Sequence, residues 1–142
     1  MARVIGARAH AARLRGIRGQ DMVRKVGAAL FVAGQAIQVE AQLSITRGAV
    51  SGKGHVPSAP GQPPNQDTGV LANNIETTQI EDLKVHVSSN APYAVPLEVG
   101  TSKMEARPYM APAAHAKRKE ATQLVRRAVD KAIRESKSSR RD

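Results

Sequence analysis

A long stretch rich in glycine and proline divides this chain into two parts. Residues 47–70 hold five glycines and four prolines, and no apolar period survives in them. Proline fixes φ and disfavours helix at the preceding residue, so we expect residues 57–64 to be extended. A connection of this length exceeds what compact domains ordinarily use. We therefore predict a long extended loop that is functional, or that orders on meeting a partner.

Helical periodicity precedes the loop. Apolar residues recur at spacings of three and four, which predicts a long helix over residues 21–46 with Asp21 as its N-cap; they are Val23, Val26, Leu30, Ala33 and Ile37. Gly27 and Gly34 lie inside this helix, and each weakens it by about 1 kcal/mol relative to Ala. They either permit close packing by a neighbouring chain or are simply tolerated.

A second amphipathic pattern closes the chain. One face of the predicted C-terminal helix is apolar; it consists of Ala121, Leu124, Val125, Ala128, Val129, Ala132 and Ile133. Lys and Arg cover most of the remaining surface. Pro112 suits the first turn of this helix, because proline lacks the N–H that would be unpaired there.

Between the predicted loop and the last helix, apolar and polar residues alternate as they do in a strand. Leu83, Val85 and Val87 alternate with polar residues, which predicts a half-buried strand that leaves His86 on the solvent side. Residues 75–80 can pair with it through a turn near residues 81–82, and a short helix is expected over residues 93–99. The predicted fold class is α+β: a long N-terminal helix, an antiparallel β-hairpin or small sheet, and a long C-terminal helix, with the extended Pro/Gly-rich loop.

Charge is concentrated at the two ends. The net charge is +6 over residues 1–25, −2 over residues 26–116 and +6 over residues 117–142. We predict a flexible basic arm over residues 1–20, a single domain over residues 21–136 and a frayed tail over residues 137–142. Glycines 6, 16 and 19 argue against one stable helix in the arm. The two basic ends suit DNA or an acidic protein surface, or are solvated ends that aid solubility. The residues that we name as possible contacts lie on the arm; they are Arg3, Arg8, Arg13, Arg15 and Arg18.

Composition limits the possible chemistry. The chain has no Trp, one Phe and two Tyr, so its core is small and we expect it to gain stability from neighbouring subunits. The absence of cysteine excludes disulfides and thiol chemistry. No uninterrupted apolar run reaches the 18 or so residues of a membrane span, so no membrane contact is expected.

No motif in the sequence indicates catalysis. The four histidines lack partners at metal-ligand spacing, no GxSxG elbow occurs, and residues 48–54 miss the spacing of a phosphate-binding loop. We therefore predict that the protein is not an enzyme, with no catalytic, cofactor-binding or metal-binding residues and no cofactor.

Two segments resemble a known family. Residues 57–75 contain a "D-T-G-x-L" element built from Asp67, Thr68, Gly69 and Leu71. Residues 91–114 are similar to the family pattern "Y-A-x-x-x-E-x-G-T-x-x-M-x-A-R-P-[YF]-[ML]-x-P-A", which falls here on Tyr93, Ala94, Glu98, Gly100, Thr101, Met104, Ala106, Arg107, Pro108, Tyr109, Met110, Pro112 and Ala113. The family is the minor tail component, or tail-completion (head–tail morphogenesis) family, of long-tailed phages, and the resemblance covers about residues 20–135.

The resemblance implies a virion protein made in the host bacterial cytoplasm. It would form a homo-oligomeric ring at the neck, around the DNA channel, and a sixfold ring would match the tail. Neighbouring neck and tail proteins would be its partners, together with packaged DNA bound non-specifically. Two alternatives stay open: a non-specific nucleic-acid-binding protein, and an enzyme or assembly chaperone absent from the particle.

Residues 93–112 also have a physical interpretation. Gly100 would allow a turn, and Pro108 and Pro112 would stiffen the path into the last helix. The large side chains of Tyr93, Met104, Tyr109 and Met110 would anchor the segment on the core, or would simply fill it. Glu98 and Arg107 could form a charge pair within the subunit or across a ring interface.

Overall fold

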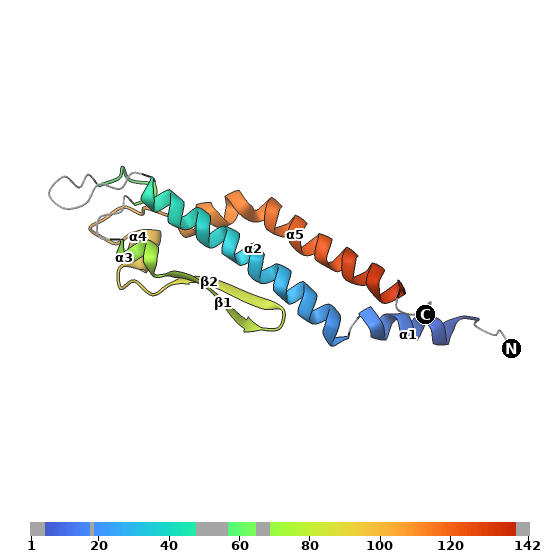
Figure 1. Cartoon of the computed structure of the whole chain (residues 1–142). Helices are drawn as coiled ribbons and strands as arrows, with labels where there is room; N and C mark the ends of the chain where they lie inside the picture. Colours follow the sequence, from blue (N-terminus) through green and yellow to red (C-terminus); the bar gives the residue numbers. More distant parts are fainter. Residues whose placement is uncertain (1–4, 18, 48–56, 65–68, 139–142) are drawn as a thin grey trace.

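The fold is α+β, as the sequence predicts. The computed structural model describes residues 5–17, 19–47, 57–64 and 69–138 (Figure 1). Its elements, in chain order, are α1 (Ala7–Ile17), α2 (Gln20–Thr46), α3 (Val70–Asn73), β1 (Ile75–Glu81), β2 (Lys84–Ser89), α4 (Ala94–Val99) and α5 (Met110–Ser138).

Helix α2 is the central element of an elongated molecule. It runs antiparallel to α5, which lies along one side of it, and the β1–β2 hairpin lies along another side (Figure 1). Helices α3 and α4 gather at the end where α2 finishes and α5 begins, while α1 lies at the opposite end, against α5. Side-chain hydrogen bonds join α2 to β1 and to α3: Thr77 Oγ1 donates to Gln38 Oε1 at 2.7 Å, and Gln42 Nε2 donates to the Ala72 carbonyl at 3.0 Å.

The hairpin packs against α2 at two glycines. A Cβ on Gly34 would lie 2.8 Å from Thr77 Cγ2 and 2.9 Å from Val85 Cγ1, and one on Gly27 would collide with the Asp82 carbonyl oxygen. The hairpin therefore lies close to the helix backbone at both glycines, through the carbonyl of its turn at Gly27 and through side-chain methyl groups of its strands at Gly34. Close packing was one of the two expectations for these glycines, but the segment that packs there is the chain's own hairpin rather than a neighbouring chain.

The core is concentrated at one end of the molecule. It joins the last turns of α2, helix α3, the start of β1, helix α4 and the start of α5; its members are Ala41, Ile45, Leu71, Ala72, Ile75, Ala91, Ala94, Tyr109 and Ala113. Five of these nine core residues are alanines, so the buried apolar area per residue is small. Toward the other end, α2, α5 and the hairpin tip share few fully buried side chains, with Ala33 and Ala132 the two buried apolar residues outside that cluster in the described chain.

Several sequence predictions need correction. Residues 7–17 form helix α1, although the glycines of the arm argued against one stable helix there. Helix α1 packs against α5, so tertiary contact offsets the low helix propensity. The N-cap of α2 is Gly19, with no side-chain hydrogen bond; Asp21 lies inside the first turn. Leu83 lies in the hairpin turn with Asp82, one residue beyond the predicted turn. Helix α5 continues to Ser138, past the predicted fraying point.

Other predictions hold. The short helix after the hairpin exists as α4, Pro112 lies in the first turn of α5, and His86 is exposed.

Residues 57–64, predicted to be extended, contain a turn: Gln62 N–H donates to the Ala59 carbonyl at 3.1 Å, and Gly61 between them has a φ of +79°. Residues 48–56 and 65–68 of the predicted loop lie outside the described residues, so their extended form stays a prediction.

By length and composition alone, α2 could cross a membrane, although no uninterrupted apolar run in the sequence indicates this. The central helix of a folded domain meets the same criterion, and here α2 lies between the hairpin and α5.

Candidate functional site: the signature junction and a basic helical face

Residues 93–112, the segment that resembles the family pattern, connect the hairpin to α5. We call this segment the signature junction. Helix α4 ends at Gly100, where φ is +78° and an added Cβ would lie 2.8 Å from the Ala106 nitrogen. Only glycine meets both conditions without strain. Thr101 and Met104 then close a tight turn, with Thr101 N–H donating to the Met104 carbonyl at 2.8 Å. The chain is thereby turned back toward the start of α5.

Glu98 caps α5 from a distance. Its Oε2 accepts hydrogen bonds from the backbone N–H groups of Tyr109 at 2.9 Å and Met110 at 3.0 Å, and its Oε1 accepts one from Ala111 at 2.9 Å. The first N–H groups of a helix have no partner within the helix, and the positive end of the helix dipole favours a carboxylate. Glu98 thus fastens α4 to the N-terminus of α5.

Tyr109 anchors the junction in the core. Its side chain is 2% exposed, and its hydroxyl lies 3.5 Å from the Ala94 carbonyl, to which it donates. Burial raises the pKa of this phenol. Tyr93, by contrast, is 42% exposed and does not anchor the loop, whereas Met104 is half-buried and Met110 packs against the core.

Within the subunit, Glu98 and Arg107 do not form the predicted ion pair, whereas a pair across a ring interface stays a prediction. The carboxylate of Glu98 faces the α5 backbone instead, because three N–H donors converge there. Arg107 N–H donates to the Leu97 carbonyl at 2.6 Å, and its Nε is buried without a hydrogen-bond partner in the structure as described. Arg107 therefore holds the junction through its backbone.

The proline-rich segment meets the junction. Gly61 N–H donates to the Ala106 carbonyl at 2.9 Å, so residues 57–64 lie against the signature junction.

The D-T-G-x-L element reaches the core through its last residue. Leu71 is 6% exposed, and Gly69 immediately precedes α3. Asp67 and Thr68 lie outside the described residues. Pro108 is half-buried, and Pro112 is exposed.

An exposed ion-pair cluster joins α2 to the far end of α5. Lys25 Nζ pairs with Asp21 at 2.8 Å and with Glu135, and Arg24 pairs with Asp21 at 2.6 Å. The hydrogen bond from Lys25 lowers the pKa of Asp21 and of Glu135, and the bond to Asp21 is the main cause that raises the pKa of Lys25. Glu135, one of the acidic residues of α5, is therefore already paired within the chain.

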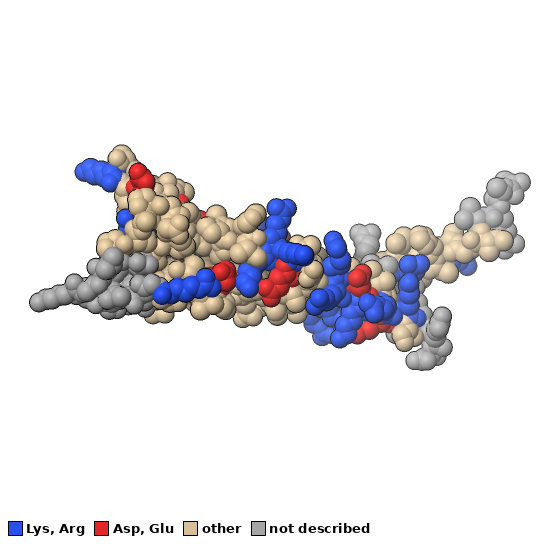
Figure 2. Space-filling model, turned by 90° about the horizontal axis from the view of Figure 1, so that it is seen from above, with Lys and Arg blue, Asp and Glu red and all other residues tan. Residues whose placement is uncertain are grey.

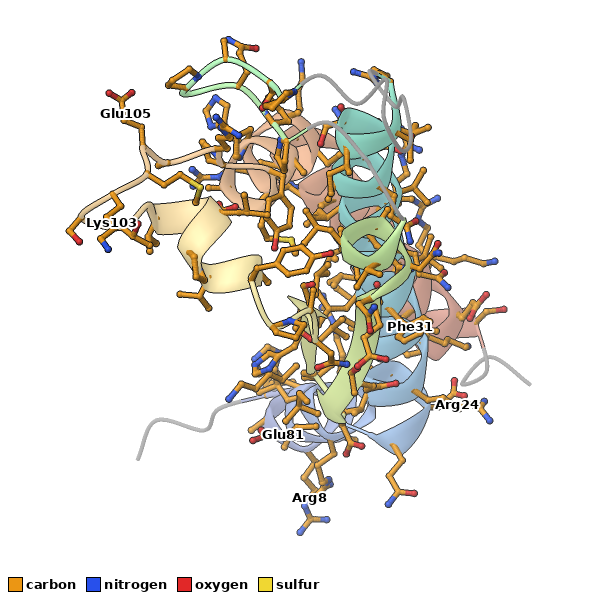
Figure 3. All side chains as sticks on the ribbon, turned by 90° about the vertical axis from the view of Figure 1, so that its left-hand side faces the viewer. Arg8, Arg24, Phe31, Glu81, Lys103 and Glu105 are labelled. Carbon is orange, nitrogen blue, oxygen red and sulfur yellow. The ribbon has the colours of Figure 1, made fainter. Side chains whose placement is uncertain are left out.

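Basic side chains dominate α1 and α5. Three Arg lie on α1 with no acid, and α5 has eight Lys and Arg against three acids. Two of those acids, Glu120 and Glu135, pair with Lys117 and Lys25. We call the exposed basic residues of the two helices the α1–α5 basic face; they are Arg8, Arg13, Arg15, Arg118, Lys119, Arg126, Arg127, Lys131, Arg134 and Lys137. Figure 2 shows Lys and Arg gathered toward the end of the molecule where α5 finishes, whereas Arg8 of α1 points to the other side (Figure 3). Arg3 and Arg18 lie outside the described residues.

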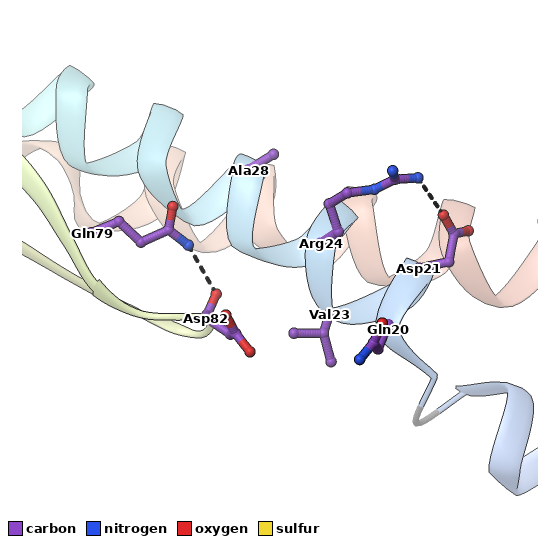
Figure 4. Close-up of a pocket in the computed structure, with 7 residues that line it drawn as sticks. All are labelled: Gln20, Asp21, Val23, Arg24, Ala28, Gln79 and Asp82. Carbon is purple, nitrogen blue, oxygen red and sulfur yellow. Dashed lines mark hydrogen bonds and ion pairs between the residues drawn. The ribbon is translucent and has the colours of Figure 1, made fainter.

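A surface depression near the hairpin tip offers no chemistry. It is lined by the start of α2 and by Gln79 and Asp82 (Figure 4). Its polar groups bond to one another: Arg24 pairs with Asp21, and Gln79 Nε2 donates to the Asp82 carbonyl at 3.1 Å. In the part of the chain that the structure covers, no cluster of acidic or histidine side chains could hold a metal ion.

Sequence reasoning did not identify two features of this region. It did not foresee that Glu98 caps α5. It found both ends of the chain basic but named individual contact residues only on the arm, although α5 contributes more of the basic face. The charge count of residues 117–142 was the signal that could have identified α5. Comparisons of the chain with family models, with curated proteins and with solved structures give no match.

Proposed function

We propose that the protein is a structural subunit of a tailed-phage virion, forming a ring at the neck around the DNA channel. One observation supports this most: the segment that resembles the tail-completion family is used for architecture. Glu98, Gly100 and Tyr109 respectively cap a helix, make a turn and fill the core. Each of the three residues thus supports the fold of the segment, so a structural role is the simplest one for the motif.

The charge distribution is compatible with this role. The α1–α5 basic face would stand near packaged DNA, bound through phosphate contacts without sequence preference. Neighbouring neck and tail proteins would cover other faces. The chain would be made in the host cytoplasm and then incorporated in the virion.

Electron microscopy of particles lacking the protein tests this proposal. Separate filled heads and complete tails are expected, with joining restored by the wild-type chain supplied in trans. Heads attached to tails of normal length would contradict it. Detection of the chain in purified virions excludes the alternative of an assembly chaperone that leaves the particle.

A second candidate is a non-specific nucleic-acid-binding protein, favoured by the α1–α5 basic face. Here the monomer itself would bind duplex DNA at submicromolar concentration in physiological salt. Affinity should fall steeply as salt rises, because phosphate-bound counterions are released on binding. Replacing Arg126, Arg127 and Arg134 by Gln should reduce the slope of log K against log salt by about 0.9 per lost phosphate contact. Weak binding by the monomer would argue against this candidate.

A further inference from the structure

The β1–β2 hairpin is a two-stranded sheet, so each strand has an outer edge. Helix α2 packs on one face of the hairpin, and α3 contacts β1 (Figure 1). A strand at the edge of a sheet presents unpaired N–H and C=O groups, which can pair with another strand. Whether the two edges are free here depends on where the backbone groups of the hairpin point.

The register of the hairpin fixes which backbone groups point outward. Asn90 N–H donates to the Asn74 carbonyl at 3.2 Å, so these two residues form a hydrogen-bonded pair. In an antiparallel ladder such pairs alternate with non-hydrogen-bonded pairs, whose N–H and C=O groups point away from the partner strand. In the observed register the non-hydrogen-bonded pairs are Ile75↔Ser89, Thr77↔Val87 and Gln79↔Val85.

The outward groups of these pairs have no backbone partner in the structure as described. Apart from the ladder of the hairpin itself, no backbone–backbone hydrogen bond of the described chain involves residues 75–89. Both strands lack proline, and the residues with outward groups are uncharged, so two devices that protect sheet edges are absent. Each edge is therefore able to accept a further strand.

The residues with outward backbone groups also face α2 with their side chains. Thr77 and Val87, a cross-strand pair, both lie against Gly34 of α2. When the edges of two copies join, residues with outward groups pair with one another. Their side chains then lie on the same face of the joined sheet, so the α2 helices of both copies lie on that face as well.

The two strands carry charges of opposite sign. Strand β1 has Glu76 and Glu81 and no basic residue, whereas β2 has Lys84 and no acidic residue. All three side chains are exposed and none forms an ion pair with a described residue, although Glu76 accepts a hydrogen bond from Asn90 at 2.8 Å. Opposite charges on neighbouring strands are stabilising, and like charges are destabilising. A β1 edge therefore matches a β2 edge better than it matches a second β1 edge.

We propose that the β2 edge of one copy pairs antiparallel with the β1 edge of the next, so that the hairpins of successive copies form one continuous sheet. This interface rests on the proposed ring and specifies the strands that would build it. Antiparallel pairing makes β1 run in the same direction in every copy. The copies are then related by rotation, and head-to-tail contacts of this kind close into rings or extend as filaments.

Hydrogen exchange of the purified full-length chain tests the pairing at the backbone. The outward amides within the two edges are those of Thr77, Gln79, Val85 and Val87. In the assembled wild type they should exchange about tenfold more slowly than in the dilute monomer, or slower still. The amides of the Thr78↔His86 pair bond within the hairpin and should be protected in both states. Assembled chains whose outward amides exchange as fast as those of the monomer would overturn the proposal.

A charge exchange, followed by sedimentation, tests the choice of strands. Lys84→Glu makes β2 acidic, and Glu76→Lys with Glu81→Lys makes β1 basic. Each variant then has two edges of like sign, so its association constant should fall by about tenfold relative to the wild type. An equimolar mixture should assemble as the wild type does, because each acidic edge again meets a basic one. Circular dichroism checks that each variant keeps its fold.

Matched controls reverse the same charges on exposed residues outside the hairpin. Lys103→Glu is the control for the single variant, and Glu105→Lys with Asp130→Lys is the control for the double variant. Both controls should assemble like the wild type. The proposal is wrong if the wild type is monomeric at all concentrations, if a hairpin variant alone assembles like the wild type, if the mixture stays monomeric, or if the controls are equally impaired.

The particle experiments are independent of this result. A chain that assembles through its strand edges but is absent from virions would retain the interface and reject the neck function. A monomeric wild type that is nevertheless found in virions would do the reverse.

Discussion

Removal of the Glu98 carboxylate is the sharpest test of how the signature junction is held together. Glu98→Ala leaves three N–H groups at the start of α5 without their partner, and these groups belong to Tyr109, Met110 and Ala111. Hydrogen bonds to a charged group contribute about 1.5–3 kcal/mol each when measured singly. Here one half-buried carboxylate serves all three, and water can reach the exposed Ala111 in the variant.

The expected loss is therefore well below the sum of three bonds. Replacement of an ordinary N-cap costs about 0.5–2 kcal/mol, and the charge at the positive end of the helix dipole adds about 0.3–1 kcal/mol. We expect Glu98→Ala to lower the free energy of unfolding by about 1–3 kcal/mol. For a chain of this size the midpoint of thermal unfolding should fall by about 3–10 °C. Glu98→Gln keeps one acceptor oxygen and should lose about half as much.

Glu105→Ala is the matched control. Glu105 lies in the segment that connects α4 to α5 and is exposed, and its substitution removes the same charge. The structure shows no ion pair for it among the described residues. Urea unfolding followed by far-UV circular dichroism gives the free energies of all three variants. If Glu98→Ala and Glu105→Ala differ by less than about 0.5 kcal/mol, the size of an ordinary surface substitution, the capping argument is wrong.

Three further predictions concern other parts of the fold. Gly27→Ala should destabilise the protein by about 1–2 kcal/mol in urea unfolding, because overpacking against the Asp82 backbone outweighs the gain in helix propensity; a gain in stability would contradict the close approach of the hairpin. Glu135 has a lowered pKa in the folded state, so its contribution to stability is present above its ordinary value of 4.5 and is lost as pH falls through the folded value. Urea midpoints measured from about pH 7 to about pH 3 should decline less steeply in Glu135→Gln than in the wild type, and parallel acid limbs would refute the ion pair with Lys25. Tyr109→Phe should change stability by less than about 1 kcal/mol, since the hydroxyl bond is long, whereas Tyr109→Ala should cost about 3–5 kcal/mol from the cavity left in the core.

The sequence alone determined the elements that depend on local pattern. Apolar residues at helical and strand spacing correctly predicted α2, the hairpin and α5, because periodicity records which face of an element is buried. The position of Pro112 in the first turn of α5 followed from local stereochemistry as well, and the short helix α4 was expected close to where it lies. The imbalance of charge between the ends and the middle also follows from the residue counts alone.

Only the tertiary structure decided which segments meet. Glu98 binds N–H groups up to 13 positions further along the chain, and the turn at Gly100 that brings them together leaves no periodic signal. The packing of the hairpin at Gly27 and Gly34, the folding of α1 against α5, and the outward position of Tyr93 likewise depend on distant contacts. A residue pattern reports the burial of a face, whereas the partner that buries it is fixed by long-range packing.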